Sequence, residues 1–210
     1  MHPRRRAEPD AGPAAESARN LLTACAVLVV GVLVCIYRAP KPIDTTDGLS
    51  WFGVTRATVV EYGITLLVTA ALLLRAAAPL AEVPALRPTR IGLTACAALL
   101  PLMLATPYTL NTFMNWTHMT IGALLFVLQL ALLSWLWWAR ARTPAVLGLL
   151  VVQFLAGVVC FSSLVDLDAW MLDGQLVFQV AFTAGVALAL ESTSRAAVPA
   201  PNEPSACGQT

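Results

Sequence analysis

Apolar residues follow one another along this chain in long blocks, and short polar segments separate the blocks. Each block is close to the roughly 20 residues that an α-helix needs to cross the hydrocarbon core of a bilayer. Six blocks stand out, and they cover residues 20–37, 57–75, 91–107, 119–138, 145–165 and 174–191. The pattern therefore predicts an all-α fold, a polytopic membrane helix bundle with six transmembrane helices.

The composition agrees with a membrane protein, and the short connections leave no room for a separate soluble domain. Hydrophobic residues make up 58% of the chain and charged residues only 12%, whereas soluble domains carry about 25% charged residues. Residues 1–18 and 196–210 are rich in alanine, proline and polar residues and lack apolar periodicity. We expect them to be disordered cytoplasmic tails on either side of a transmembrane domain over residues 19–195.

Basic residues are distributed unevenly among the segments between the blocks. They gather before the first block, in the second and fourth connections and after the last block: Arg4, Arg5, Arg6, Arg19, Arg75, Arg87, Arg90, Arg140, Arg142 and Arg195. By the positive-inside rule, both termini are then cytoplasmic. The first connection is discordant, because it carries Arg38, Lys41 and Arg56. Arginine far outnumbers lysine, which is typical of a high-GC bacterium and would place the protein in a plasma membrane.

The fourth block carries a polar stripe on one helical face. Its members fall within about 40° of one another on a helical wheel: Asn111, Asn115, His118, Gly122 and Gln129. Lipid cannot satisfy these groups, so we expect the stripe to face the interior of the bundle. Other blocks repeat the pattern with Thr58, Glu61, Thr65 and Thr69, with Gln153, Gly157 and Cys160, and with Gln175, Gln179 and Thr183. Such residues commonly join helices by hydrogen bonds worth about 0.6 kcal/mol each.

With both termini cytoplasmic, the first, third and fifth connections face out. The candidate site is formed by the ends of these stripes that lie near those connections. Glu61 is the sole acid embedded in a block, and a carboxylate at that depth needs a partner. His118, Arg56 or water could serve: pairing with His118 would make a site for a proton or a polar headgroup, whereas pairing with Arg56 would be structural. The candidate ligand-binding pocket comprises Glu61, Asn115, His118, Asp166, Gln175 and Gln179. Trp51, Trp116 and Trp170 are more typical of the aromatic belt at headgroup depth.

Catalytic and cofactor motifs are absent from the sequence. It contains no phosphate-binding glycine loop, no G-x-S-x-G and no H-E-x-x-H. His118 and scattered carboxylates are too few for a typical zinc site, and paired histidines for haem are lacking. Four cysteines fall inside apolar blocks, where cysteine acts as a small hydrophobe. We therefore expect no cofactor, no metal and no disulfide, and no basic run indicates nucleic acid.

Two stretches carry a resemblance to known membrane proteins. "DGLSWFG", in the first connection, and "NWTHMTIG", which opens the fourth block, look like small six-span actinobacterial membrane proteins of unknown function. More distantly, "LSWFG" and the histidine at the start of the fourth block are similar to the DRAM-like six-span family, which is associated with lipid remodelling and membrane trafficking. The second resemblance implies lipid handling at the outer leaflet and brings no catalytic residue with it.

Three classes of function remain open from the sequence. The favoured one is a binding or accessory membrane protein, whose outward-facing polar pocket takes a lipid or another amphiphile. A proton-coupled small-molecule transporter is the alternative, although the interrupted helices and internal repeats of many transporters are not apparent. An intramembrane lipid-modifying enzyme is the least favoured, with Glu61, His118, Asp166 and Asp168 as its only candidate groups. The expected partners are the lipid bilayer, a lipid or small amphiphile, and another membrane protein.

Overall fold

The structure, a computed structural model, describes residues 12–40, 47–164 and 170–196. Six of its helices are long and apolar enough to cross a membrane. Their bounds are Pro13–Arg38 (α1), Val59–Ala77 (α2), Arg87–Ala105 (α3), Thr112–Ala139 (α4), Pro144–Leu164 (α5) and Met171–Ala196 (α6). Three short 3-10 helices lie in the connections: Leu49–Gly53 (η1), Pro79–Glu82 (η2) and Pro84–Leu86 (η3). The predicted all-α bundle with six transmembrane helices is confirmed, and the chain is a multi-pass membrane protein.

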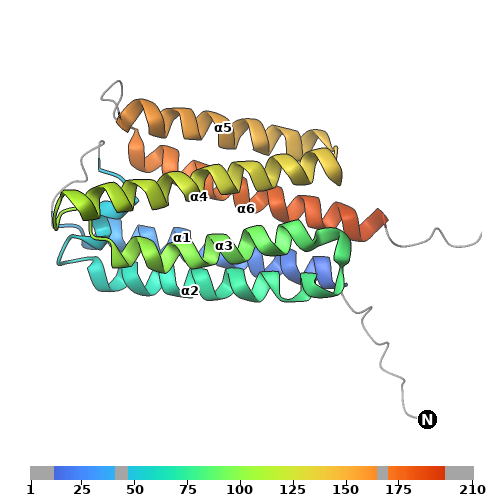
Figure 1. Cartoon of the computed structure of the whole chain (residues 1–210), viewed down its shortest axis with the longest axis horizontal. Helices are drawn as coiled ribbons and strands as arrows, with labels where there is room; N and C mark the ends of the chain where they lie inside the picture. Colours follow the sequence, from blue (N-terminus) through green and yellow to red (C-terminus); the bar gives the residue numbers. More distant parts are fainter. Residues whose placement is uncertain (1–11, 41–46, 165–169, 197–210) are drawn as a thin grey trace, which may run out of the picture.

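The helices run nearly parallel or antiparallel to one another along the long axis of the molecule (Figure 1). The start of α1 and the end of α6 lie at one end of the bundle, which we call the terminal end; the other end carries η1 and is called the η1 end. Helix α1 packs against α2 and α6, α2 also against α3, and α5 against α6. Helix α4 packs mainly against α3 and makes less extensive contacts with α5 and α6.

Glycines allow the closest helix approaches. A Cβ atom on Gly31 of α1 would lie 2.1 Å from the Thr65 hydroxyl oxygen of α2, and one on Gly174 of α6 would lie 2.9 Å from the Cys160 sulfur of α5. Neither distance is sterically possible, so these two seams depend on the missing side chain. Small residues at contact points are typical of membrane helix pairs, where packing replaces the hydrophobic effect as the source of association.

Helix α1 begins earlier than the sequence pattern predicts. Residues 13–18 were expected to belong to a disordered tail, but α1 starts at Pro13 and includes them. Proline suits the first turn of a helix because its fixed φ is helical and its missing N–H would have no partner there. The turn is also held by packing, since the buried Ser17 hydroxyl donates to the Ala76 carbonyl of α2 over 2.7 Å.

The main hydrophobic core fills the terminal half of the bundle. All six long helices contribute fully or almost fully buried side chains to it, among them Leu21, Leu73, Leu93, Leu132, Leu133, Leu136, Val146, Phe182 and Leu190. At the rim of this half, the Arg140 guanidinium donates to the Ala85 carbonyl in η3 over 3.0 Å. A smaller core at the η1 end surrounds Phe52 and Tyr62. The terminal half is therefore the closed part of the molecule.

Candidate functional site

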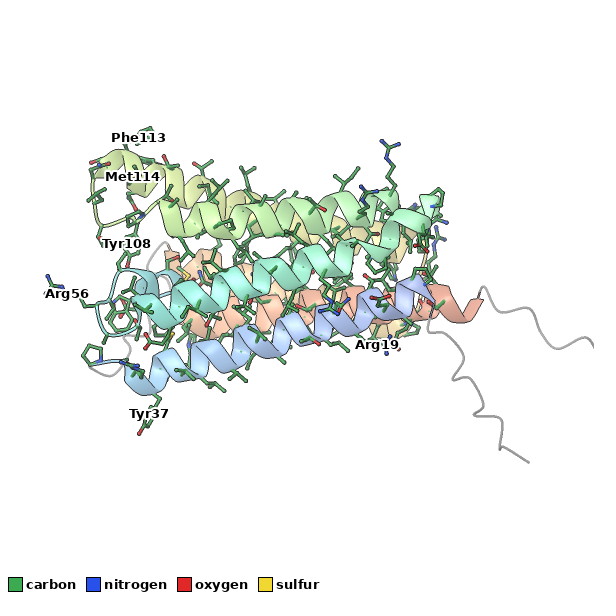
Figure 2. The ribbon with its side chains drawn as sticks, turned by 90° about the horizontal axis from the view of Figure 1, so that it is seen from below. Arg19, Tyr37, Arg56, Tyr108, Phe113 and Met114 are labelled. Carbon is green, nitrogen blue, oxygen red and sulfur yellow. The ribbon has the colours of Figure 1, made fainter. Side chains whose placement is uncertain are left out.

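His118 enters the bundle from the first turns of α4. Asn111 caps this helix by accepting a hydrogen bond from the Met114 N–H over 2.9 Å. His118 lies beyond the cap on the inward face and is only 7% exposed, as the polar stripe predicts. Asn111 and Asn115 do not follow the prediction, because both are exposed. They occupy the end of α4 that extends past the packed helices, near the labelled Phe113 and Met114 (Figure 2).

Both ring nitrogens of His118 have hydrogen-bond partners. Nδ1 lies 2.8 Å from the Thr106 carbonyl oxygen, and Nε2 lies 2.7 Å from the Ser50 hydroxyl oxygen in η1. A carbonyl can only accept, so the network assigns the proton of the neutral ring to Nδ1. Nε2 is then an acceptor, and the Ser50 hydroxyl donates to it.

Ser50 owes its position to the anchoring of η1. The neighbouring Phe52 is completely buried in the core at the η1 end. Its carbonyl accepts a hydrogen bond from the buried Thr58 hydroxyl over 2.9 Å. The Leu49 N–H donates to the Gln175 side-chain oxygen of α6 over 2.6 Å. The 3-10 turn is thus fixed on both sides of Ser50, by α2 and by α6.

Glu61 does not pair with His118 or Arg56, and the prediction of either pair is wrong. It forms an ion pair with Arg38, in the last turn of α1. Helices α1 and α2 are antiparallel neighbours, which brings the end of one beside the start of the other. Arg56 is exposed and points away from the bundle (Figure 2). Arg38 is one of the discordant basic residues of the first connection, and its ion pair with Glu61 accounts for its presence there.

Two glutamines join α4 and α6 deeper in the bundle. The Gln129 amide donates to the Gln179 oxygen over 2.9 Å, and the Gln179 amide donates back to the Gln129 oxygen over 3.1 Å. The Thr69 hydroxyl, on α2, is buried without a hydrogen-bond partner in the described part of the chain. Each amide group of the pair retains a second N–H, so hydrogen-bonding capacity remains at this depth.

Two adjoining cavities lie in the η1 half, and the central one extends to the edge of the main core. A side cavity of about 330 Å³ lies among η1, α3, α4, α5 and α6, and its polar lining consists of Ser50, His118 and Gln175 with the Cys160 thiol. A central cavity of about 100 Å³ reaches toward the bundle axis. They share lining residues, namely Ser50, Met103, Gly122, Phe126 and Gln175. The volume of the side cavity falls within the range of about 300–1,000 Å³ for small-molecule sites.

The side cavity opens on the lateral surface of the bundle between α4 and α5. Val127 and Phe161 line it and are each 66% exposed. Both also line a groove of about 270 Å³ that continues along the two helices past Phe154 and Val158. A membrane would cover this surface with acyl chains. A ligand in the side cavity can therefore be in contact with lipid along one side.

The lining is almost entirely uncharged. Among the described residues that line the two cavities and the groove, none is Asp, Glu, Lys or Arg. Glu61 lines neither cavity. The same holds for Asn115, which is exposed. A charged headgroup would find no Asp, Glu, Lys or Arg among these described residues, whereas hydroxyl, carbonyl and ester groups would find hydrogen-bond partners.

The candidate pocket of the sequence analysis is thus partly assembled. The structure brings His118 and Gln175 together at the side cavity, and Gln179 lines the central one. Glu61 and Asn115 belong elsewhere, and Asp166 and Asp168 lie outside the described residues. Ser50 was missed, although it stands in "DGLSWFG", one of the two stretches that the sequence analysis singled out.

Comparisons with known protein families, with curated proteins and with solved structures give no match to this chain.

Proposed function

We propose that this protein binds an uncharged amphiphile, such as a neutral lipid, in the side cavity of its η1 half. The observation that carries the proposal is the form of that cavity. It has a hydrogen-bonding end made by Ser50, His118 and Gln175, and an apolar remainder that opens between α4 and α5. An amphiphile has the same two parts, with a polar head next to an apolar chain.

The polar head of the amphiphile, and not its apolar chain, should determine which ligand the cavity prefers. An acyl chain that moves from the bilayer into an apolar groove exchanges one apolar environment for another, so the move itself gains little free energy. Hydrogen bonds made inside the membrane have no competing water and give the site its preference. The uncharged lining excludes phosphate and carboxylate heads, because a buried charge needs a partner.

The tight packing of the terminal half of the bundle favours a binding protein over a transporter. Leu132, Leu133 and Leu136 of α4 pack into the main core there, and none of them lines the side or the central cavity. With both termini cytoplasmic, as the arginine distribution predicts, the polar end of the cavity would face the outer leaflet of a bacterial plasma membrane. The resemblance to the DRAM-like family also points to lipid handling.

The test is to identify the lipids that remain bound after purification and to fill the cavity. Gly122 lines both cavities, and a Cβ there would lie 3.8 Å from its nearest neighbour, so Gly122→Leu should fold while occupying the space of the ligand. Native mass spectrometry should show a neutral lipid on the unmodified protein and at least a fivefold smaller bound fraction on this variant.

The matched control is Gly148→Leu, the same change on an exposed position of α5 with open space around it. It should retain the lipid in full. Loss of lipid from both variants, or from neither, would contradict the assignment of the cavity as the binding site.

A further inference from the structure

The Ser50–His118 hydrogen bond has the geometry of a nucleophile and its base. The serine oxygen lies 2.7 Å from Nε2, and the opposite nitrogen is oriented by the Thr106 carbonyl at 2.8 Å. A hydroxyl, an imidazole that accepts its proton and a third group that holds the imidazole are the parts shared by serine-dependent acyl-transfer sites on unrelated folds. Here the third group is a backbone carbonyl and not a carboxylate.

The pair faces the proposed binding site and not the interior of the core. Ser50 lines both the side and the central cavity, and His118 lines the side cavity. A purely structural bond between η1 and α4 would not need to face open space. The side cavity opens between α4 and α5, so the pair can be reached from the lipid side. A small cavity of about 20 Å³ also adjoins Ser50 and His118, on the side of Pro107 and Tyr108.

Gln175 adds a donor beside the pair. Its side-chain oxygen accepts from the Leu49 N–H, which fixes the orientation of the amide. The amide nitrogen then has two N–H groups for which no described residue is an acceptor, and Gln175 lines the same cavity as Ser50. A donor in this place can stabilise the oxyanion that forms when a hydroxyl adds to a carbonyl.

From these contacts we propose that Ser50 is an acyl-transfer nucleophile and His118 its general base, acting on a carboxylic ester carried by the bound neutral lipid. The proposal rests on the proposed function, because the substrate is the amphiphile of the side cavity. It deepens that function by assigning an ester to the ligand and a reaction to the site.

The overall reaction is hydrolysis of the ester, with water as the second substrate. Ser50 Oγ bonds to the ester carbonyl carbon while its proton passes to His118 Nε2, and the alcohol leaves with that proton as its C–O bond breaks. Water then adds to the acyl-serine, giving one proton to Nε2. The Ser50 oxygen departs with that proton, and a carboxylic acid is released. The Nδ1–H donates to the Thr106 carbonyl throughout and holds the ring in place.

The rate should be low. A carbonyl dipole stabilises the imidazolium that forms in each step less than a carboxylate would, and loss of that carboxylate is costly in serine proteases. An activated probe is therefore a better first reagent than a natural ester. A lipophilic fluorophosphonate, which phosphonylates activated serines, can reach the pair through the opening between α4 and α5.

The experiment labels the full-length protein in detergent and locates the modified residue by mass spectrometry. We expect the label on Ser50 and its complete loss in Ser50→Ala. His118→Gln should slow labelling by roughly a hundredfold or more, the usual contribution of a general base. Ser162→Ala is the matched control, because Ser162 is also near the η1 end but donates to the Val159 carbonyl, and it should label normally.

A second measurement needs no substitution in the pair. The labelling rate of the unmodified protein should fall as the pH is lowered, since an imidazolium cannot accept the serine proton. The other described titratable residues that line a cavity together with His118 are Tyr62, Tyr108 and Cys160. The ring centroids of Tyr108 and His118 are 5.5 Å apart. Burial raises the pKa of the Tyr108 hydroxyl, and the Asp47 charge raises it further, so Tyr108 stays neutral over this range.

The outcomes separate this inference from the proposed function. Absence of label on Ser50, or a labelling rate that does not depend on pH and is unchanged in His118→Gln, overturns the acyl-transfer role. If the neutral lipid is still found on the unmodified protein in that case, binding stands without catalysis. If neither lipid nor label is found, both proposals fail.

Discussion

The two halves of α4 have opposite roles in the packing of the bundle. Toward the terminal end, Leu133 and Leu136 are completely buried in the main core. Toward the η1 end, Gly122 and Ala123 line the side cavity, and Val127 on the same stretch is exposed on the lateral surface. One half of the helix fills space, and the other leaves it open.

Side-chain volume explains this difference better than hydrophobicity does. The α4 residues that border the gap, Gly122, Ala123 and Val127, are apolar like those of the core, so their polarity does not account for it. Leucine side chains reach across to α3 and α6, whereas glycine and alanine leave a gap that the neighbouring helices do not close. Stability and binding are therefore expected to depend on different halves of the molecule, and the following substitutions test that separation.

The largest effect should come from opening the packed half. Leu133→Ala removes a completely buried side chain that contacts Gly185 of α6, and such a change typically costs 2 to 5 kcal/mol, here about 3. The melting temperature in detergent measures it. Leu124→Ala, on the same helix but 54% exposed, should change the temperature little. Equal effects at the two positions would contradict the contrast between packed and lipid-facing α4.

Replacing a glycine by a larger residue should change the stability less. The size of that change should depend on whether the glycine lies in the packed terminal half or beside the cavities. A Cβ on Gly185 would lie 2.7 Å from a Leu133 methyl group, whereas one on Gly122 has 3.8 Å of clearance. We expect Gly185→Leu to destabilise the protein by about 2 kcal/mol through overpacking. Gly122→Leu should leave its thermal midpoint unchanged or raise it. A larger loss at Gly122 would mean that the cavity is not open space.

The next prediction concerns a buried polar side chain that lacks a hydrogen bond within the described part of the bundle. Gln153 is completely buried on α5, and neither of its amide atoms has a hydrogen-bond partner among the residues that the structure describes. Gln153→Leu removes this penalty and should stabilise the protein by about 1 kcal/mol. Gln129→Leu is the informative counterpart, because it breaks a formed pair with Gln179 and should destabilise. Stabilisation by both changes would contradict the glutamine pair.

The smallest effect is expected at the ion pair outside the cavities. Arg38 is 54% exposed and Glu61 26% exposed, and pairs near a surface are worth about 0.5 kcal/mol. A double-mutant cycle with Arg38→Gln and Glu61→Gln should show a coupling of that size, decreasing as salt is added. The cycle that combines Glu61→Gln with His118→Gln should be additive, since the structure places no contact between them. Coupling in the second cycle and not in the first would restore the Glu61–His118 pair, one of the alternatives that the sequence left open.

The fold could be predicted because its dominant constraint is local. Twenty apolar residues in a row have to form a helix in a bilayer, as an unpaired backbone has no alternative there. The positions of Gln129 and His118 on one face likewise follow from helical periodicity alone. The start of α1 was placed too late because Pro13 and the Ser17–Ala76 hydrogen bond were not recognised as parts of a helix.

The partners of polar residues could not be predicted in the same way. A helical wheel says which side of a helix a residue occupies, but it does not say which neighbouring helix lies there. His118, Arg56 and water were the partners considered for Glu61, whereas the antiparallel order of α1 and α2 brings Arg38 to it. Ser50 has no periodicity to reveal it, because it lies in a 3-10 turn whose place depends on Phe52 and Gln175.

Because the side cavity opens between α4 and α5, its occupancy depends on the concentration of the ligand in the membrane and not in water. A molecule that arrives through Val127 and Phe161 comes from the bilayer, and its chemical potential is set by its mole fraction among the lipids. Its concentration in water, where an apolar chain is scarcely soluble, has little bearing on occupancy. Binding constants measured in micelles should consequently shift with the amount of detergent, which dilutes the ligand within the apolar phase. Measurements in bilayers of fixed lipid ratio should give a single value regardless of total lipid.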